Sequence, residues 1–254
     1  MLMLALAMLI AAAPLDRDRA ALLHVLESTA GGDGCSASER RVAAQTAGIA
    51  RLGTIGGDAV LLASPHASCL CGTVNCPWFA LRLGSGEPRV LLETSAFSVE
   101  AIDADRPLPR LRERAHDSAL VVDETIDAYA DGRYASVAST RVRADNGERK
   151  PLSIPIRFAP GASAALLRGS VALGWGDTYT FSAQRGQRVA IAHVRSSVPI
   201  EITLFDRRGR ANVVELTAGV PAVLTSDGTF ALNVDNGSDA ERPSVPYAFT
   251  LSIR

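Results

Sequence analysis

Residues 176–191 constrain the fold of this chain more than any other stretch, because apolar and polar side chains alternate on both sides of a short turn. Tyr179, Phe181 and Ala183 lie on one side of an extended chain, so the first half predicts a strand with one buried face. Gly186 supplies the turn, since glycine adopts positive φ without steric cost. The alternation then resumes. The pattern therefore predicts a β-hairpin in an antiparallel sheet.

Further alternating segments surround this stretch. They are short, regularly spaced and separated by turn residues, which is typical of an antiparallel sandwich. They lie at residues 154–158, 165–171, 200–204, 230–234 and 247–253. No cysteine occurs in this part of the chain, so its stability has to come from burial of the alternating faces. We therefore predict a jelly-roll-like antiparallel β-sandwich over residues 152–254.

The preceding part of the chain mixes helices and strands. Apolar residues recur at helical spacing over residues 17–28, and a second short helix is expected over 37–47. Strand-like segments then dominate, at residues 59–62, 78–83, 90–93, 97–102 and 119–122. Asp131-Gly132 predicts a hairpin turn between two alternating runs. The sum is an α+β domain with an antiparallel sheet over residues 17–145, and the whole chain is predicted to be mainly β.

The first residues predict export. Residues 1–13 form an apolar run that ends in three alanines, and charged residues follow it. The run is shorter than the roughly 20 residues that span a bilayer, but it suits a secretory signal peptide. A buried helix of a cytoplasmic protein is the alternative. We expect a periplasmic or secreted bacterial protein with no transmembrane anchor after the signal is removed.

Four cysteines support export. Cys35, Cys69, Cys71 and Cys76 form an even set, as expected where disulfides persist. A Cys71–Cys76 bridge would close a tight ring and leave Cys35 to pair with Cys69, although three connectivities are open. A metal site with His66 is the alternative, but the spacing lacks the paired C-x₂-C knuckles of structural zinc sites. We therefore predict disulfides, and no metal or other cofactor.

The sequence predicts no catalytic residue. It contains no G-x-S-x-G, H-E-x-x-H or phosphate-binding glycine loop. His116, Asp117 and Ser118 are adjacent on an extended chain and point to opposite sides, so they cannot form a triad. Acidic residues occur at positions 103, 105, 123, 124 and 127, but their spacing is not that of a calcium-binding loop. The net charge of −1 argues against a nucleic-acid partner.

Four motifs in the last hundred residues resemble two families of exported bacterial domains. These motifs are I-R-F-A-x-G-A-S-A-A-x-L-x-G-S-V at 156–171, D-x-Y-x-F-x-A-x-x-G-Q at 177–187, S-D-G-T-F-A-L-N-V at 226–234 and Y-x-F-x-L-x-I at 247–253. The segment is similar to periplasmic inhibitors of goose-type lysozyme and to prepeptidase C-terminal β-sandwich domains. The earlier part, around residues 69–79 and 129–134, looks like an uncharacterised exported bacterial domain.

The inhibitor resemblance implies a rigid sandwich that presents polar and basic side chains to the acidic cleft of a lysozyme. It implies arginines in the loop before the last strand, where this sequence departs from the pattern with a single arginine, Arg242, beside two acids. Asp177 and Tyr179 match the motif and join Arg242 as candidate binding residues. The alternatives are an exposed rim residue for Arg242, a turn cap for Asp177 and a core aromatic for Tyr179.

The function predicted from these features is a non-catalytic exported protein whose sandwich binds a macromolecule. A lysozyme or a cell-envelope glycan is the expected partner. One alternative makes the sandwich an accessory module of an amino-terminal hydrolase-like domain. Another is a structural or assembly role in the cell envelope.

Overall fold

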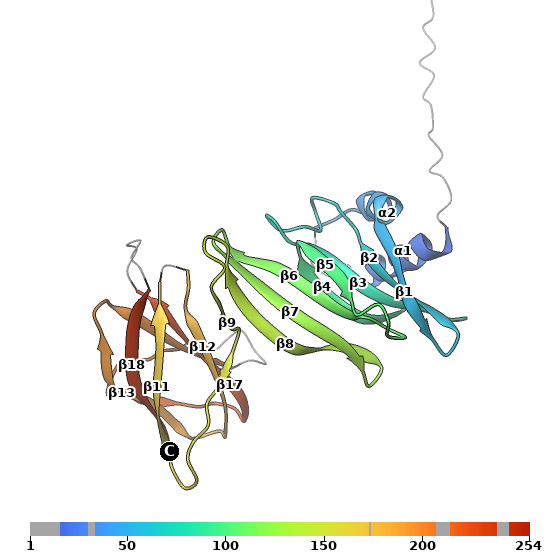
Figure 1. Cartoon of the computed structure of the whole chain (residues 1–254). Helices are drawn as coiled ribbons and strands as arrows, with labels where there is room; N and C mark the ends of the chain where they lie inside the picture. Colours follow the sequence, from blue (N-terminus) through green and yellow to red (C-terminus); the bar gives the residue numbers. More distant parts are fainter. Residues whose placement is uncertain (1–15, 30–33, 173, 207–213, 238–243) are drawn as a thin grey trace, which may run out of the picture. The chain divides into compact units, whose positions relative to one another are not determined.

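The computed structural model describes residues 16–29, 34–172, 174–206, 214–237 and 244–254, which form two compact units (Figure 1). The first unit lies within residues 1–115 and 126–137, and the second comprises 116–125 and 138–254. The predicted signal peptide at residues 1–13 lies outside the described residues. Within the described part of the chain, no helix has both the length and the apolar character needed to cross a membrane.

Two helices and a four-stranded antiparallel sheet come first in the described part of the chain. The helices are α1 (Arg17–Ser28) and α2 (Ala37–Thr46), and the sheet has the order β1-β2-β3-β4. Its strands are β1 (Gly48–Ile55), β2 (Asp58–Ser64), β3 (Cys76–Leu83) and β4 (Arg89–Ala96). A five-stranded sheet with the order β5-β6-β7-β8-β9 follows. Its strands are β5 (Ser98–Ile102), β6 (Arg110–Ser118), β7 (Val121–Ala130), β8 (Arg133–Arg143) and β9 (Arg149–Pro151).

Both faces of the β1–β4 sheet are buried. One face packs against the helices, where Leu22 and Leu26 of α1 share one core with Leu61 and Leu81. The opposite face, which includes Val60, joins a second core with residues of β5, β6 and β8. This two-sided burial explains the continuous apolar run of β2, since a strand covered on both faces needs no polar alternation.

The helix starts and one turn follow directly from sequence. Asp16 caps α1 by accepting from the Arg19 amide, and Ser36 with Glu39 forms a capping box on α2. Asp131 and Gly132 adopt positive φ of 51° and 82°, as a tight turn between β7 and β8 requires. The hairpin predicted at this position is therefore confirmed.

Two strand predictions in this half of the chain need correction. The apolar run 119–122 is not a strand throughout, because β6 ends at Ser118 and β7 begins only at Val121. Strands β1 and β6 were not predicted. Arginines and a glutamate interrupt the apolar pattern of β6. The arginines lie partly buried along the sheet, and Glu113 is buried.

Two disulfides join the cysteines. Cys71 pairs with Cys76 and Cys35 with Cys69. The prediction of two disulfides is confirmed. Of the three possible connectivities, the observed one is that in which Cys71 and Cys76 close a short ring. His66 lies close to the Cys71 and Cys76 sulfur atoms, but bonded sulfurs offer no thiolate to a metal.

The second unit contains a two-sheet sandwich. One sheet has the order β10-β12-β17-β14-β15 and the other β11-β18-β13-β16. The first consists of β10 (Ile154–Pro155), β12 (Asp177–Ala183), β17 (Gly228–Asn236), β14 (Ile200–Asp206) and β15 (Val214–Glu215). The second consists of β11 (Ala164–Val171), β18 (Val245–Ile253), β13 (Arg188–Ser196) and β16 (Ala222–Val223). The predicted mainly β fold is thus confirmed.

The predicted hairpin over residues 176–191 is wrong. Strands β12 and β13 belong to different sheets, so the turn at Gly186 carries the chain across the sandwich. Tyr179 and Phe181 of one strand and Ile191 of the other still point into the same core. Alternation fixes which face of a strand is buried, but it does not say whether the next strand pairs beside it or packs opposite it.

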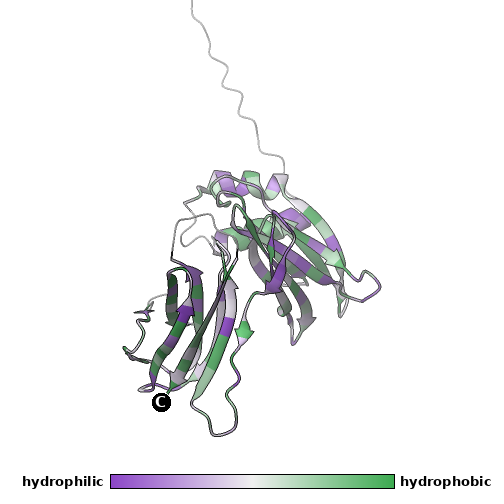
Figure 2. Cartoon of the chain, turned by 60° about the vertical axis from the view of Figure 1, so that its left-hand side comes forward, coloured by the Kyte–Doolittle hydropathy of each residue, from purple (hydrophilic) through white to green (hydrophobic). Residues whose placement is uncertain are grey.

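Alternating burial organises the sandwich core. Along β18, every second residue from Val245 to Ile253 is buried, and Phe249 and Leu251 are fully buried. Figure 2 shows apolar and polar residues alternating along the strands. In the first sheet Phe181 stacks on its cross-strand neighbour Phe230, with ring centroids 5.8 Å apart. Burial of these faces stabilises a sandwich that contains no disulfide.

We predict that Phe249→Ala destabilises the protein by about 3–5 kcal/mol, because it leaves a cavity at the centre of the sandwich. Val220→Ala is the matched control, since Val220 is 59% exposed. Urea unfolding followed by circular dichroism measures both. Equal stability losses for the two variants would contradict the assignment of Phe249 to the core.

Candidate binding surface and the polar centre behind it

The outer face of the β11-β18-β13 sheet forms a trough. The central strand β18 presents only small side chains outward, including Ala248 and Thr250, because its larger residues point into the core. Longer side chains stand on the flanking strands. The resulting depression measures about 380 Å³ and is lined by Leu166, Arg168, His193, Arg195, Ala248 and Thr250. We call these six residues the basic trough.

Two arginines face each other across the basic trough. Arg168 of β11 pairs with Ala248 of β18, and Ala248 pairs on its other side with Arg195 of β13. The three residues therefore form one row across the sheet, which places the two arginine Cα atoms about 10 Å apart. Because alanine is short, the space between the two guanidinium groups is open to a ligand.

An irregularity in β13 shapes one wall of the trough. The pairing register of β13 with β18 shifts between Ala192 and Arg195. His193 within this bulge has a φ of 53°, which is uncommon for a residue other than glycine. Bulges redirect side chains and are over-represented next to binding and active sites. Here three successive residues, 193–195, are exposed.

The charge of the trough is not balanced by the described residues. Neither Arg168 nor Arg195 forms an ion pair with a carboxylate in the described ranges, although many other arginines of the chain do. A guanidinium group can donate two parallel hydrogen bonds to a carboxylate, and neither of these two has a carboxylate partner in the described ranges. The trough is therefore suited to an acidic group.

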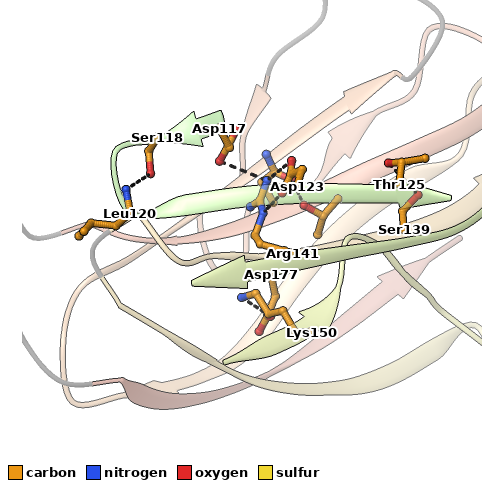
Figure 3. Close-up of polar contacts among 11 residues, drawn as sticks. Asp117, Ser118, Leu120, Asp123, Thr125, Ser139, Arg141, Lys150 and Asp177 are labelled. Atoms are coloured by element: carbon orange, nitrogen blue, oxygen red, sulfur yellow. Dashed lines mark hydrogen bonds and ion pairs between the residues drawn. The ribbon is translucent and has the colours of Figure 1, made fainter. Parts of the chain in front are cut away.

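A polar centre lies behind this sheet, inside the second unit. Asp177 of β12 is 6% exposed. Its Oδ1 accepts from the Lys150 Nζ at 2.8 Å, and its Oδ2 accepts from the Tyr247 hydroxyl at 2.7 Å and the Ser170 amide at 3.2 Å. These bonds tie β9, β11, β12 and β18 to one carboxylate. Figure 3 shows the contact between Lys150 and Asp177.

The polar centre also holds the backbone of the basic trough. The Tyr179 hydroxyl lies 2.9 Å from the Tyr247 hydroxyl and donates to the carbonyl oxygen of Arg168 at 2.8 Å. Burial raises the pKa of Tyr179 and places the pKa of Tyr247 far above its usual range. Both phenols therefore remain protonated and act as donors. The interior network thus fixes the strand that carries Arg168 on its outer side.

Arg141 organises a neighbouring cluster of acids. Its guanidinium contacts Asp123 at 2.8 Å and Asp117 at 3.2 Å (Figure 3). Burial opposes the charge of Arg141, but the hydrogen bond to Asp123 and the charges of nearby aspartates raise its pKa overall. Burial raises the pKa of Asp235, while the charges of Arg141 and Lys150 oppose that shift. Asp117 and Asp123 therefore pair with an arginine.

A third cluster lies in the first unit. Glu113 of β6 and Asp127 of β7 are 9% and 4% exposed, and Glu113 Oε2 accepts from the Thr94 hydroxyl at 2.8 Å. Burial, with the neighbouring Asp127 charge, raises the pKa of Glu113 to about 7, and burial raises the pKa of Asp127. Two like charges in one buried site favour sharing a proton. Sequence alone placed Asp127 among scattered acids and did not single out Glu113.

The three binding candidates from the sequence have different positions. Asp177 and Tyr179 point into the interior, where they support the basic trough from behind. Arg242 lies outside the described residues and stays a prediction. Arg168 and Arg195 were missed, because a lone arginine in a strand carries no motif. The sequence contained one indication of the trough: in an alternating strand, Arg168 must point outward because its neighbour Leu167 points into the core.

Part of the chain is similar to solved structures of bacterial lysozyme inhibitors. The structure of PliG from Aeromonas hydrophila, a periplasmic lysozyme inhibitor of g-type lysozyme, is 24% identical, covers 40% of this chain and 96% of its own, and has a TM-score of 0.35. A mutant PliG of Escherichia coli and PliG of Salmonella Typhimurium are 22% and 21% identical. They cover 40% and 41% of this chain, and 97% and 100% of their own chains, each with a TM-score of 0.36. No family model matches the chain, and no curated protein sequence matches it significantly.

We predict that Gly169→Ala destabilises the second unit. An added Cβ would lie 2.1 Å from Asp177 Oδ2 and 2.4 Å from the Tyr247 hydroxyl, so the polar centre would have to shift. The expected cost is about 1–3 kcal/mol in urea unfolding. Gly86→Ala is the control, because an added Cβ there meets nothing within 4 Å. No difference between the two variants would argue against this close packing.

We predict that Glu113→Gln stabilises the protein above pH 7 and not below pH 4.5. The folded pKa of about 7 exceeds the unfolded value of 4.5, so the folded state binds the proton more tightly and wild-type stability falls as pH rises through this window. The expected difference at pH 8 is on the order of 1–3 kcal/mol. Urea unfolding of both proteins from pH 4 to 8 measures it. A pH-independent difference would contradict the buried carboxyl pair.

Proposed function

We propose that this chain is a non-catalytic exported protein whose sandwich binds an acidic macromolecular partner through the basic trough. The observation that carries this proposal is the row Arg168, Ala248 and Arg195, in which two guanidinium groups flank a short residue and lack a described carboxylate partner. Such a row is electrostatically unfavourable on its own, and a bound acidic group would compensate it.

The form of the trough favours a macromolecule over a small ligand. It lies open on the outer face of a sheet, and the 55%-exposed Leu166 forms part of its wall. Arginine and an apolar anchor around a desolvated centre are typical of protein interfaces, and such interfaces extend over about 800 Å² per partner. The trough would then be the centre of a larger contact surface.

A lysozyme is the partner that we infer first. The sequence motifs at 156–171 and 177–187 resemble those of lysozyme inhibitors, and the similar solved structures are of inhibitors of g-type lysozyme. The two disulfides support a periplasmic or secreted location. Arg242 precedes β18, the central strand of the trough, by three residues in sequence, and we include it in the proposed contact surface.

We predict that the purified protein slows lysis of peptidoglycan by a goose-type lysozyme at near-stoichiometric ratio. Arg168→Glu/Arg195→Glu should weaken inhibition at least tenfold, because it reverses the charge that faces the partner. Arg157→Glu is the matched control, since Arg157 is an exposed arginine of the same unit outside the trough. Arg242→Glu, measured alongside, reports separately on the segment before β18.

The same assay can reject the proposal in two ways. No inhibition at large molar excess would remove the lysozyme partner. Equal loss of inhibition in Arg168→Glu/Arg195→Glu and in Arg157→Glu would remove the trough as the contact surface, because a general charge effect would then explain the result. Circular dichroism of each variant confirms that the sandwich still folds.

A further inference from the structure

We propose that Lys150 and Asp177 condense to an intramolecular amide, which joins β9 covalently to β12. The proposal concerns the polar centre and is independent of what the basic trough binds. It assigns a modification to the only lysine in a chain that otherwise uses arginine for every cation. Arginine can form the ion pair with Asp177, but it cannot form this amide.

The reacting groups already lie in contact. The Lys150 Nζ is 2.8 Å from Asp177 Oδ1, and the two side chains are 15% and 6% exposed. The Nζ also lies 4.5 Å from the ring centroid of Trp175, which is itself buried. Water is therefore largely excluded from the pair. Holding an amine against a carboxyl group in this way supplies most of what a condensation needs.

Burial disfavours the charged form of the Lys150 amine. In the proposed step the ammonium passes one proton to the Asp177 carboxylate, which leaves the neutral amine that attacks. In agreement, burial lowers the pKa of Lys150, although the Asp177 hydrogen bond opposes the shift. Asp235, whose pKa burial raises, provides a second protonatable carboxyl in the electrostatic field of Lys150.

The hydrogen bonds of Asp177 match the charge that develops in the reaction. The neutral amine attacks Cγ, and a C–N bond forms while Oδ2 becomes an oxyanion. The Tyr247 hydroxyl and the Ser170 amide already donate to Oδ2, at 2.7 and 3.2 Å, as an oxyanion site requires. Oδ1, which carries the carboxyl proton, takes a second proton from the attacking nitrogen. The Cγ–Oδ1 bond then breaks, water leaves, and the Cγ–Oδ2 double bond re-forms. One water is lost, and no oxidant or reductant is needed.

A glycine at position 169 leaves room for the two hydrogen-bond donors around Asp177 Oδ2. Gly169 lies where a Cβ would come within 2.4 Å of both Asp177 Oδ2 and the Tyr247 hydroxyl. Its hydrogen side chain lets both donors reach the same oxygen. The second unit contains no cysteine, and β9 is only three residues long. An amide bond would fix this short strand as a disulfide would.

Peptide mapping tests the proposal on the wild-type protein. Trypsin cleaves after arginine and not before Pro151, so it releases peptides 150–157 and 169–185. We expect a single branched species, lighter than the sum of the two peptides by the mass of one water, with fragment ions that locate the link at Lys150 and Asp177. Recovery of the two separate peptides in full from folded protein kept at pH 7 would overturn the proposal.

Two variants test the mechanism. Lys150→Arg keeps the positive charge and must give separate peptides. Tyr247→Phe removes a donor to Oδ2 but leaves the ion pair, so the branched species should form at least tenfold more slowly when protein recovered unfolded from inclusion bodies is refolded. Circular dichroism checks that Tyr247→Phe folds at the wild-type rate. Equal rates of cross-linking would contradict the assignment of Tyr247 as the oxyanion donor.

Discussion

The buried carboxylate of Asp177 links more of the second unit than any other single group described in it. Removing a carboxylate from water costs several kcal/mol, and only a full set of partners offsets this. Asp177 obtains them from Lys150, Ser170 and Tyr247, which come from three other strands. Each partner is satisfied only while the others stay in place. The carboxylate therefore fixes the relative positions of β9, β11, β12 and β18 within this unit.

This interior constraint reaches the outer surface through one strand. In β11, Leu167 points into the core while Arg168 points outward, and the Arg168 carbonyl accepts from the buried Tyr179. The backbone that carries the Arg168 side chain is thus held from behind by the polar centre. A binding surface on a rigid sheet loses little conformational entropy on association, which favours a preorganised contact over a flexible loop.

Local patterns in the sequence predicted both helices, the Asp131-Gly132 turn and the longer sandwich strands, because these features depend on neighbouring residues. The two-residue strands β15 and β16 were not predicted. The partner of β12 was predicted wrongly, since burial of alternate residues is the same for a hairpin and for two facing sheets. The trough could not be predicted for a related reason. Arg168 and Arg195 are far apart in sequence and meet only because β18 pairs with both flanking strands.

Two buried acidic sites show what decides the chemistry of a carboxyl group in this protein. Glu113 and Asp127 face each other with a threonine hydroxyl as their described donor, so one proton replaces the missing cation and the pKa of Glu113 rises to about 7. Asp177 instead meets a lysine, a phenol and an amide. Both sites contain buried acidic residues on strands, and they differ in the partners that other strands supply. Those partners make the stability of the first site depend on pH, and they make the second site a fixed point of the fold in which the Lys150 Nζ lies 2.8 Å from Asp177 Oδ1.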